Sequence, residues 1–184
     1  LRTPLNAIIG FMELAKDADT GQVQSYLANA DIAAKQLLSI INDVLDVSAI
    51  ESGKMKIAHV PFDFKHLIQS LTNLFVLQCR QKGLAYETKL MTAMDEWLIG
   101  DRLRVNQVLL NLMSNAVKFT TSGHVWLTVR QREEQNGRVF IRFEVSDTGC
   151  GMTEDMRARL FRPFEQESAE TAQKYGGNGL GLSI

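Results

Sequence analysis

The chain has 184 residues, of which 45% are apolar and 22% are charged, and this ordinary globular composition excludes a disordered or fibrous protein. Its 20 basic and 21 acidic residues nearly cancel, so no net field draws the whole chain to nucleic acid or to an acidic membrane surface. Cys79 and Cys150 lie far apart and outside any Cys/His cluster, which argues against a disulfide framework and a zinc site. An anionic ligand must therefore be held by a local site.

Two helices are predicted in the first 51 residues. The first runs from about Pro4 to Asp17, and the second, after a polar stretch, from about Ser25 to Glu51, where the apolar residues have near-heptad spacing. Two helices cannot bury such stripes alone. The spacing favours self-association into a four-helix bundle over packing on the rest of the chain. No apolar run is long enough to cross a membrane.

The pattern changes near Gly53, where we predict a boundary between domains of residues 1–54 and 55–184. Strands are expected at 54–60, 84–91 and 96–100, and helices at 63–83, capped by Asp63, and at 101–118. The residues of the first of these helices that are expected to face inward are Leu67, Ile68, Leu71, Leu74 and Phe75. Two strictly alternating strands, 124–133 and 138–147, are joined by a hairpin connection. This order predicts an α+β sandwich with helices on one face of a largely antiparallel sheet.

A polar stripe interrupts the otherwise apolar helix "NQVLLNLMSNAVKFT". Asn111, Asn115 and Lys118 are spaced four and three residues apart, so they share one face of the helix. Two carboxamide oxygens suit a hard cation, and an ammonium group suits phosphate. The alternative is an ordinary solvated face.

The stretch "DTGCGM" follows directly on an alternating strand. Asp147 stands at the strand end, and Gly149 and Gly151 remove side chains where a flat ligand can approach the backbone. A carboxylate only accepts hydrogen bonds, so it suits an exocyclic amine such as that of adenine. The alternative is a tight turn in which Asp147 caps a helix.

Two further segments complete the set of candidates. Phe161 and Phe164 in "FRPF" precede a polar stretch with the composition of a mobile lid, or of a plain surface loop. The glycines of "YGGNGLGLSI" leave an open backbone before an apolar helix start, which suits phosphate or, alternatively, a flexible hinge. The candidate residues there are Gly176, Gly177, Gly179, Leu180 and Gly181.

The order of these segments resembles that of the sensor histidine kinases over the whole chain. "NLMSNAVKFT" is similar to the family's N box, "DTGCGM" to its first glycine box, "FRPF" to its F box and "GGNGLGLSI" to its second glycine box. The opening "LRTPLNAIIG" resembles the end of the H box, in which a His-Glu pair precedes the leucine. The "FRPFEQ" stretch favours a hybrid kinase.

The resemblance implies a dimerisation and phosphotransfer hairpin in residues 1–54 and an ATP-binding domain of the Bergerat (GHKL) type in residues 55–184. Asn115 matches a magnesium ligand, with Asn111 in the same site, and Lys118 matches a phosphate contact. Asp147 matches the adenine-binding carboxylate, and Gly149 and Gly151 the glycines beneath the base. Phe161, Phe164, Gly177, Gly179, Leu180 and Gly181 match further ATP-binding positions.

The implied reaction transfers the γ-phosphoryl group of Mg-ATP to a histidine and then to an aspartate of a response regulator. His59, His66 and His124 lie outside any H-box context and are expected to be structural or surface residues, so the acceptor is expected just upstream of Leu1. Thr3 matches a position associated with dephosphorylating the regulator. For Thr3 and Pro4 we favour a kink in a longer helix over a helix cap.

Two alternatives share the same binding residues. A hydrolytic Bergerat ATPase has a glutamate base where this chain has Asn111, and a carboxamide cannot accept that proton. The second alternative is a non-catalytic dimeric scaffold, or a phosphatase, for a response regulator. Asn178 departs mildly from the usual Thr or Ser, and the last helix and closing strands that the resemblance implies for the ATP domain are absent from residues 55–184. The expected partners are a second copy and a receiver domain, without nucleic acid or membrane contact by this cytoplasmic part of a membrane-anchored parent.

Overall fold

The computed structural model describes residues 2–91 and 96–160. They divide into two compact units, one running to Met55 and the other beginning at Lys56. The order of elements agrees with the predicted fold class, a helical hairpin followed by a domain of mixed helices and strands. No helix in the described part of the chain is long and apolar enough to span a membrane.

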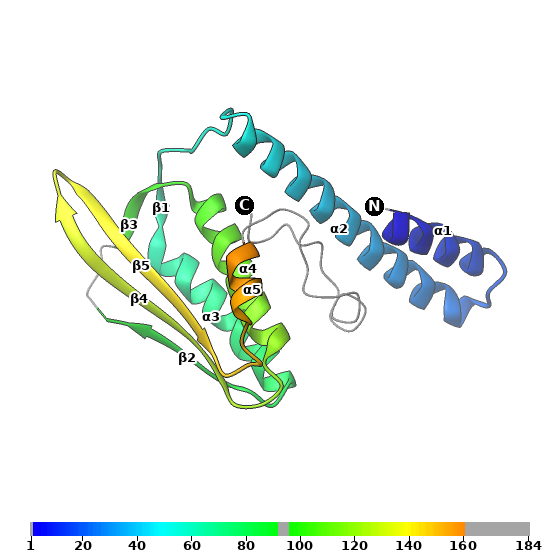
Figure 1. Cartoon of the computed structure of the whole chain (residues 1–184). Helices are drawn as coiled ribbons and strands as arrows, with labels where there is room; N and C mark the ends of the chain where they lie inside the picture. The colour runs from blue at the N-terminus through cyan, green and yellow to red at the C-terminus, as the bar shows by residue number, and fades with distance from the viewer. Residues whose placement is uncertain (1, 92–95, 161–184) are drawn as a thin grey trace. The chain divides into compact units, whose positions relative to one another are not determined.

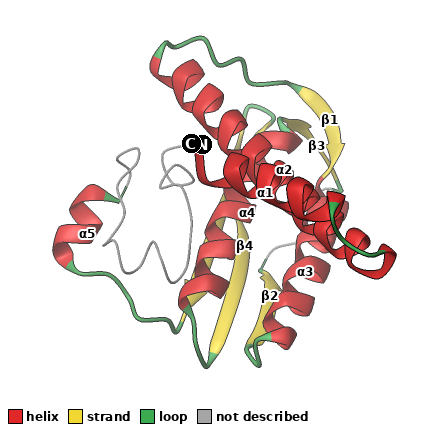
Figure 2. Cartoon of the chain, turned by 90° about the vertical axis from the view of Figure 1, so that its right-hand side faces the viewer, coloured by secondary structure: helices red, strands yellow, loops and turns green. Residues whose placement is uncertain are grey.

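The first unit is a hairpin of two helices, α1 (Arg2–Lys16) and α2 (Thr20–Glu51), which pack side by side in Figures 1 and 2. Both predicted helices are confirmed, but α2 begins at Thr20 rather than near Ser25, because the amides of Gln22 and Val23 already bond to Asp19 O. Thr3 and Pro4 lie in the first turn of α1, so the alternative that Thr3 is an N-cap is wrong.

Most of the hairpin's large apolar side chains are exposed in the single chain. Only Ala30, Ala33 and Val47 of α2 are buried, and α1 has no buried residue. The exposed side chains are Leu5, Ile9, Met12, Leu14, Leu27, Ile32, Leu38, Ile41, Val44, Leu45 and Ile50. Such an extent of apolar surface is typical of a protein interface.

A Schellman motif ends α2. Gly53 N donates to Ile50 O at 3.0 Å and Lys54 N donates to Ala49 O at 2.9 Å, with Gly53 at φ +63°. The strand predicted at 54–60 is therefore wrong: residues 54–59 have no regular structure, and β1 is Val60–Asp63. The amide of Lys54 is committed to the helix end and cannot join a ladder.

The second unit contains two sheets. β1 pairs antiparallel with β3 (Trp97–Gly100), so that Val60 lies opposite Gly100. The other sheet has the order β2 (Ala85–Leu90), β4 (His124–Gln135), β5 (Arg138–Asp147). β4 and β5 are antiparallel, but β2 and β4 are parallel, so this sheet is mixed rather than largely antiparallel as expected.

Helices α3 (Phe64–Gln81) and α4 (Arg102–Phe119) cover one face of the three-stranded sheet (Figure 1). Val125, Leu127 and Val129 of β4 are fully buried against them, as the alternation predicts. From α3 the residues Leu67, Ile68, Leu71 and Phe75 join this core, whereas Leu74, also predicted to face inward, is 41% exposed. Asn136 and Gly137, both at positive φ, form the tight turn between β4 and β5.

Candidate functional site

The polar stripe of α4 lies on the side of the helix opposite its core residues. Leu109, Met113, Ala116 and Val117 are buried, whereas Asn111, Asn115 and Lys118 are half-buried. With 3.6 residues per turn, these two sets are about half a turn apart around the axis. The three polar side chains are thus aligned along one line, as the spacing predicts.

Lys118, near the end of this stripe, has an unusual setting for a lysine. Its Nζ lies 4.8 Å from the ring centroid of Phe119. Partial burial lowers the pKa of the Lys118 ammonium below its ordinary value. An anionic group next to Nζ would relieve this penalty, because it favours the charged form.

The carboxyl end of α4 is fixed by α3. Lys82 Nζ, just past the end of α3, donates to Val117 O at 2.8 Å and to Lys118 O at 3.3 Å. A cation at this helix end also complements the helix dipole. Thr120, fully buried, donates from Oγ1 to Ala116 O at 2.7 Å and ends the helix.

The "DTGCGM" turn lies against this end of α4. Asp147 Oδ1 accepts a hydrogen bond from Gly149 N at 2.8 Å and lies 3.5 Å from Thr120 Oγ1. A Cβ at Gly149 would be 2.7 Å from Phe119 O, so no side chain fits between the turn and the helix. The carboxylate of Asp147 and the polar stripe of α4 are therefore brought to the same end of one helix.

Thr148 is enclosed by the loop that follows α4. Its Oγ1 accepts from His124 N at 3.0 Å and donates to Ser122 O at 3.1 Å. A Cβ at Gly123, which has φ +104°, would collide with the same Oγ1. The turn that carries Asp147 is thus anchored to the loop between α4 and β4.

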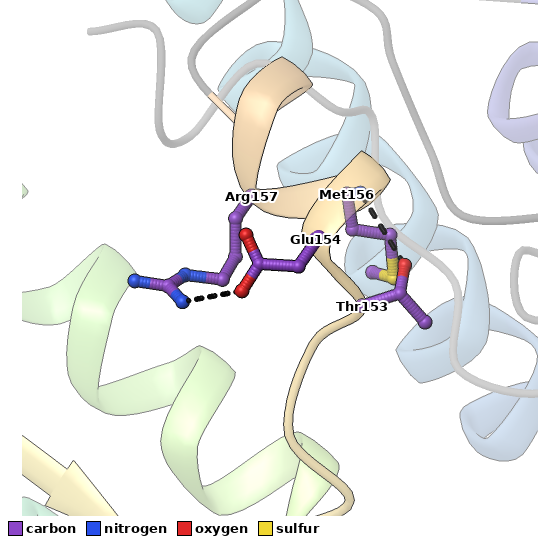
Figure 3. A network of polar contacts seen from close by, with 4 residues as sticks. All are labelled: Thr153, Glu154, Met156 and Arg157. Carbon is purple, nitrogen blue, oxygen red and sulfur yellow. Dashed lines mark hydrogen bonds and ion pairs between the residues drawn. The ribbon is translucent and has the colours of Figure 1, made fainter.

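Asp147 does not cap a helix, which was the alternative left open for it. Helix α5 (Glu154–Arg159) begins later, and its cap is Thr153, whose Oγ1 accepts from Met156 N at 3.3 Å (Figure 3). Arg157 and Glu154 form an ion pair of 3.0 Å on the same short helix. The carboxylate of Asp147 instead serves its own turn through Gly149.

The predicted site residues fall into three groups. Asn111, Asn115, Lys118, Asp147 and Gly149 are gathered around α4, with Gly151 at φ +71° two residues further along. Thr3 belongs to the hairpin unit, in α1. Phe161, Phe164, Gly176, Gly177, Gly179, Leu180 and Gly181 lie outside the described residues.

Sequence reasoning missed Lys82, Thr120 and Thr148, which position the site. Thr120 and Thr148 stand inside the quoted motifs, so their hydroxyls could have been considered as anchors. Lys82 carries no motif signal, because its contact with Val117 spans 35 residues of sequence.

Two family models match the chain. Residues 1–53 match the His Kinase A (phospho-acceptor) domain, and residues 100–184 match the histidine kinase-, DNA gyrase B-, and HSP90-like ATPase. Neither match includes residues 54–99, the region that contains α3. The candidate site of α4 and Asp147 lies inside the second match.

Similar proteins are found along the whole chain. The signal transduction histidine-protein kinase BarA of Escherichia coli K12 is 37% identical over 100% of this chain and 20% of its own length. The autoinducer 2 sensor kinase/phosphatase LuxQ of Vibrio parahaemolyticus is 39% identical over 100% of this chain and 22% of its own length. The chain therefore spans about a fifth of the length of these curated relatives.

Solved structures are also similar to the chain. The crystal structure of full-length ShkA in complex with AMPPNP has a TM-score of 0.70 and 33% identity, and it covers 99% of this chain and 37% of that one.

Proposed function

Since the chain belongs to the sensor histidine kinases, we propose that it is the catalytic core of one, which binds Mg-ATP and transfers the γ-phosphoryl group to a histidine. Residues 1–54 are the dimerisation and phosphotransfer domain, and residues 55–184 are the ATP-binding domain. The transfer then continues to an aspartate of a response regulator.

One observation carries the proposal: the Asp147 turn packs on the end of the helix that bears Asn111, Asn115 and Lys118. A purine that reaches the Asp147 carboxylate leaves its phosphates free to run beside the polar stripe. The carboxylate accepts a hydrogen bond from the exocyclic amine of adenine. Gly149 has no side chain, so the base can lie close to its backbone. The ShkA structure, which contains AMPPNP, supports a nucleotide as the ligand.

The donor set fits a magnesium ion. Asn115, with Asn111 one turn earlier, offers carboxamide oxygens that are half-buried and one helical turn apart, and oxygen is the ligand that Mg²⁺ requires. When bound, the ion supplies charge neutralisation on the phosphate oxygens. Lys118 holds phosphate by its positive charge, and the rigid helix keeps these groups in register without rearrangement.

The same helix favours a kinase over a hydrolytic ATPase. Asn111 occupies the place of the glutamate base in the hydrolytic relatives, and a carboxamide cannot take a proton from water. ATP bound here would therefore be held intact until an imidazole nucleophile approaches. The proposed acceptor is the histidine of the H box, because "LRTPLNAIIG" resembles the end of that box.

Thr3 gives a second activity some support. It matches the position associated with dephosphorylating the regulator, and the similar protein LuxQ is named a sensor kinase/phosphatase. A hydroxyl in the first turn of α1 can orient a water molecule. We propose Thr3 for this role, with the receiver domain of a response regulator as the partner.

The decisive experiment is nucleotide binding by the Asp147→Asn variant. The asparagine oxygen still accepts from Gly149 N, so the turn is retained. Its NH₂ group, however, would face the amino group of adenine, and two donors cannot form a hydrogen bond. Affinity for AMPPNP, measured by calorimetry with Mg²⁺, should fall by at least about tenfold.

Asp31→Asn, an exposed substitution on α2, is the matched control and should bind like the parent chain. Unchanged affinity in Asp147→Asn would overturn the adenine assignment. Steady ATP hydrolysis with no phosphoprotein, in the chain carrying His-Glu before Leu1, would instead favour the hydrolytic class.

A further inference from the structure

The segment that leads from the helical hairpin into the second unit is held by one carboxylate. Residues 54–59 have no regular structure, and β1 follows them directly. Because Val60 lies opposite Gly100 in the antiparallel pair, the residues just before Val60 lie beside Asp101, the residue just after Gly100. The sheet register thus brings the segment to the start of α4.

Asp101 uses both carboxylate oxygens there. Oδ1 accepts from Arg104 N at 3.1 Å and so caps α4, while Oδ2 accepts from Ala58 N at 3.0 Å. These two backbone donors lower the pKa of the Asp101 carboxyl below its ordinary value, Ala58 having the larger effect. The charged form is therefore the one that makes both contacts.

The cap of α3 provides an internal comparison. Asp63 accepts from His66 N at 2.7 Å in the same way. In the described part of the chain its side chain has no further hydrogen bond, so it serves its own helix alone. Asp101 differs from it by the contact with Ala58, which no cap requires.

We propose that Asp101 is a positioning residue that ties residues 56–59, at the start of the second unit, to α4, so that these residues and the polar stripe of α4 move as one body. The inference rests on the proposed function, because it treats α4 as the helix that carries Mg-ATP. The tie fixes where the chain from the hairpin enters the ATP-binding unit. Phosphoryl transfer has to bring the nucleotide to a histidine of the hairpin, so it should depend on where the chain from the hairpin joins the ATP-binding unit. Nucleotide binding at Asn115, Lys118 and Asp147 should not depend on it.

Three variants separate the tie from the cap. Asp101→Asn keeps a good helix cap but has only one acceptor oxygen, so it cannot serve Arg104 N and Ala58 N together. Ala58→Pro removes the donor and leaves Asp101 intact. Asp63→Asn is the matched control, since the same substitution at α3 has no second contact to lose.

The first measurement is hydrogen exchange at the amide of Ala58, which is the donor of the contact. Exchange there should rise about tenfold in Asp101→Asn, because this amide loses its hydrogen bond to a charged acceptor. Asp63→Asn should not change it. Ala58→Pro has no amide to observe and is compared in the transfer assay, where combining it with Asp101→Asn should slow transfer no more than either single variant, since both remove the same contact.

The second measurement separates binding from transfer in the chain carrying His-Glu before Leu1. In Asp101→Asn the rate of histidine phosphorylation at saturating ATP should fall about tenfold, while the dissociation constant for AMPPNP changes less than about twofold. If Asp101 served only as the cap of α4, Asp101→Asn and Asp63→Asn would lower the thermal stability equally. The rate of histidine phosphorylation would then be unchanged.

The inference is overturned if exchange at the Ala58 amide is the same in Asp101→Asn as in the parent chain, or if Asp63→Asn slows transfer as much as Asp101→Asn does. Failure of the parent chain to bind AMPPNP would refute the proposed function instead. The exchange measurement would still decide whether Asp101 holds the segment, because it needs no nucleotide.

Discussion

The hydroxyl of Thr148 illustrates how much of the site depends on residues that never face a ligand. It is enclosed by Ser122 and His124, and Gly123 leaves the space that it occupies. Since Thr148 directly follows Asp147, any rotation of this turn would move the carboxylate. Its contribution is to orientation, and orientation is what discriminates one base from another.

Thr148→Val is therefore expected to weaken AMPPNP binding by about tenfold, because an isosteric methyl group leaves His124 N and Ser122 O without their partner. Binding of the guanine analogue of AMPPNP should change much less, so the ratio of the affinities for the adenine and guanine nucleotides should fall. Calorimetry with both nucleotides measures this. Thr148→Ser, which keeps the hydroxyl, should restore the preference; if it behaves like the valine variant, the hydroxyl is not what orients the turn.

Among the elements, α4 is held at both ends by side chains, at its start by its own N-cap and at its end by a residue that follows α3. Asp101 caps its start, and Lys82 donates to two carbonyl groups at its end. The polar stripe between these two points is thereby fixed relative to β5 and to the Asp147 turn. A helix whose ends cannot fray gives a constant spacing between Asn111 and Lys118.

Lys82→Met tests the carboxyl-terminal anchor. It retains most of the apolar stem but loses the donors to Val117 O and Lys118 O, so the free energy of unfolding should fall by about 1 kcal/mol. Urea denaturation measures the change. Lys65→Met, which loses only an exposed ion pair of 4.0 Å, should be close to neutral, and an equal loss in both variants would contradict the anchor.

The local features of the elements could be predicted from the sequence. Asp63 was recognised as a helix cap, and alternation marked Val125, Leu127 and Val129 as one buried face. Asp101, expected as the first residue of its helix, is instead the cap of that helix. Pairing was not predictable in the same way, because alternation defines which face of a strand is buried but not which strand lies beside it. Hence the parallel β2–β4 pair was missed, and Lys54, committed to the end of α2, was wrongly assigned to a strand.

In the candidate site too, local features were predictable from the sequence and contacts between distant segments were not. The stripe of Asn111, Asn115 and Lys118 follows from helical spacing alone. The contact between Gly149 and Phe119 O depends on how β5 packs on α4, which no local pattern contains. Sequence reasoning therefore found the groups that we propose to face the ligand and missed the groups that position them.

For the whole molecule, the exposed apolar stripe of the hairpin is the dominant feature. The family match over residues 1–53 implies dimerisation, and a second copy would bury these side chains in a four-helix bundle. Stability of the first unit is then linked to protein concentration by mass action.

Leu38→Lys should lower the measured molar mass to that of one chain, because Leu38 is 59% exposed in the single chain and its replacement would bury a charge in the dimer. Light scattering coupled to size-exclusion chromatography gives this mass directly. Leu77→Lys, at a leucine of 55% exposure on α3, is the control and should leave the dimer intact. A dimeric Leu38→Lys variant would argue against this stripe as the interface.

The parallel pairing of β2 with β4 also constrains the order in which the chain can fold during synthesis. β4 and β5 are joined by a two-residue turn and can pair as soon as both have emerged. β2 emerges earlier, but within the described sheet its neighbour is β4, which follows only after β3 and all of α4. On the ribosome, the edge of β2 thus waits unpaired until the helix that carries the polar stripe has been made, so that helix and sheet are completed together.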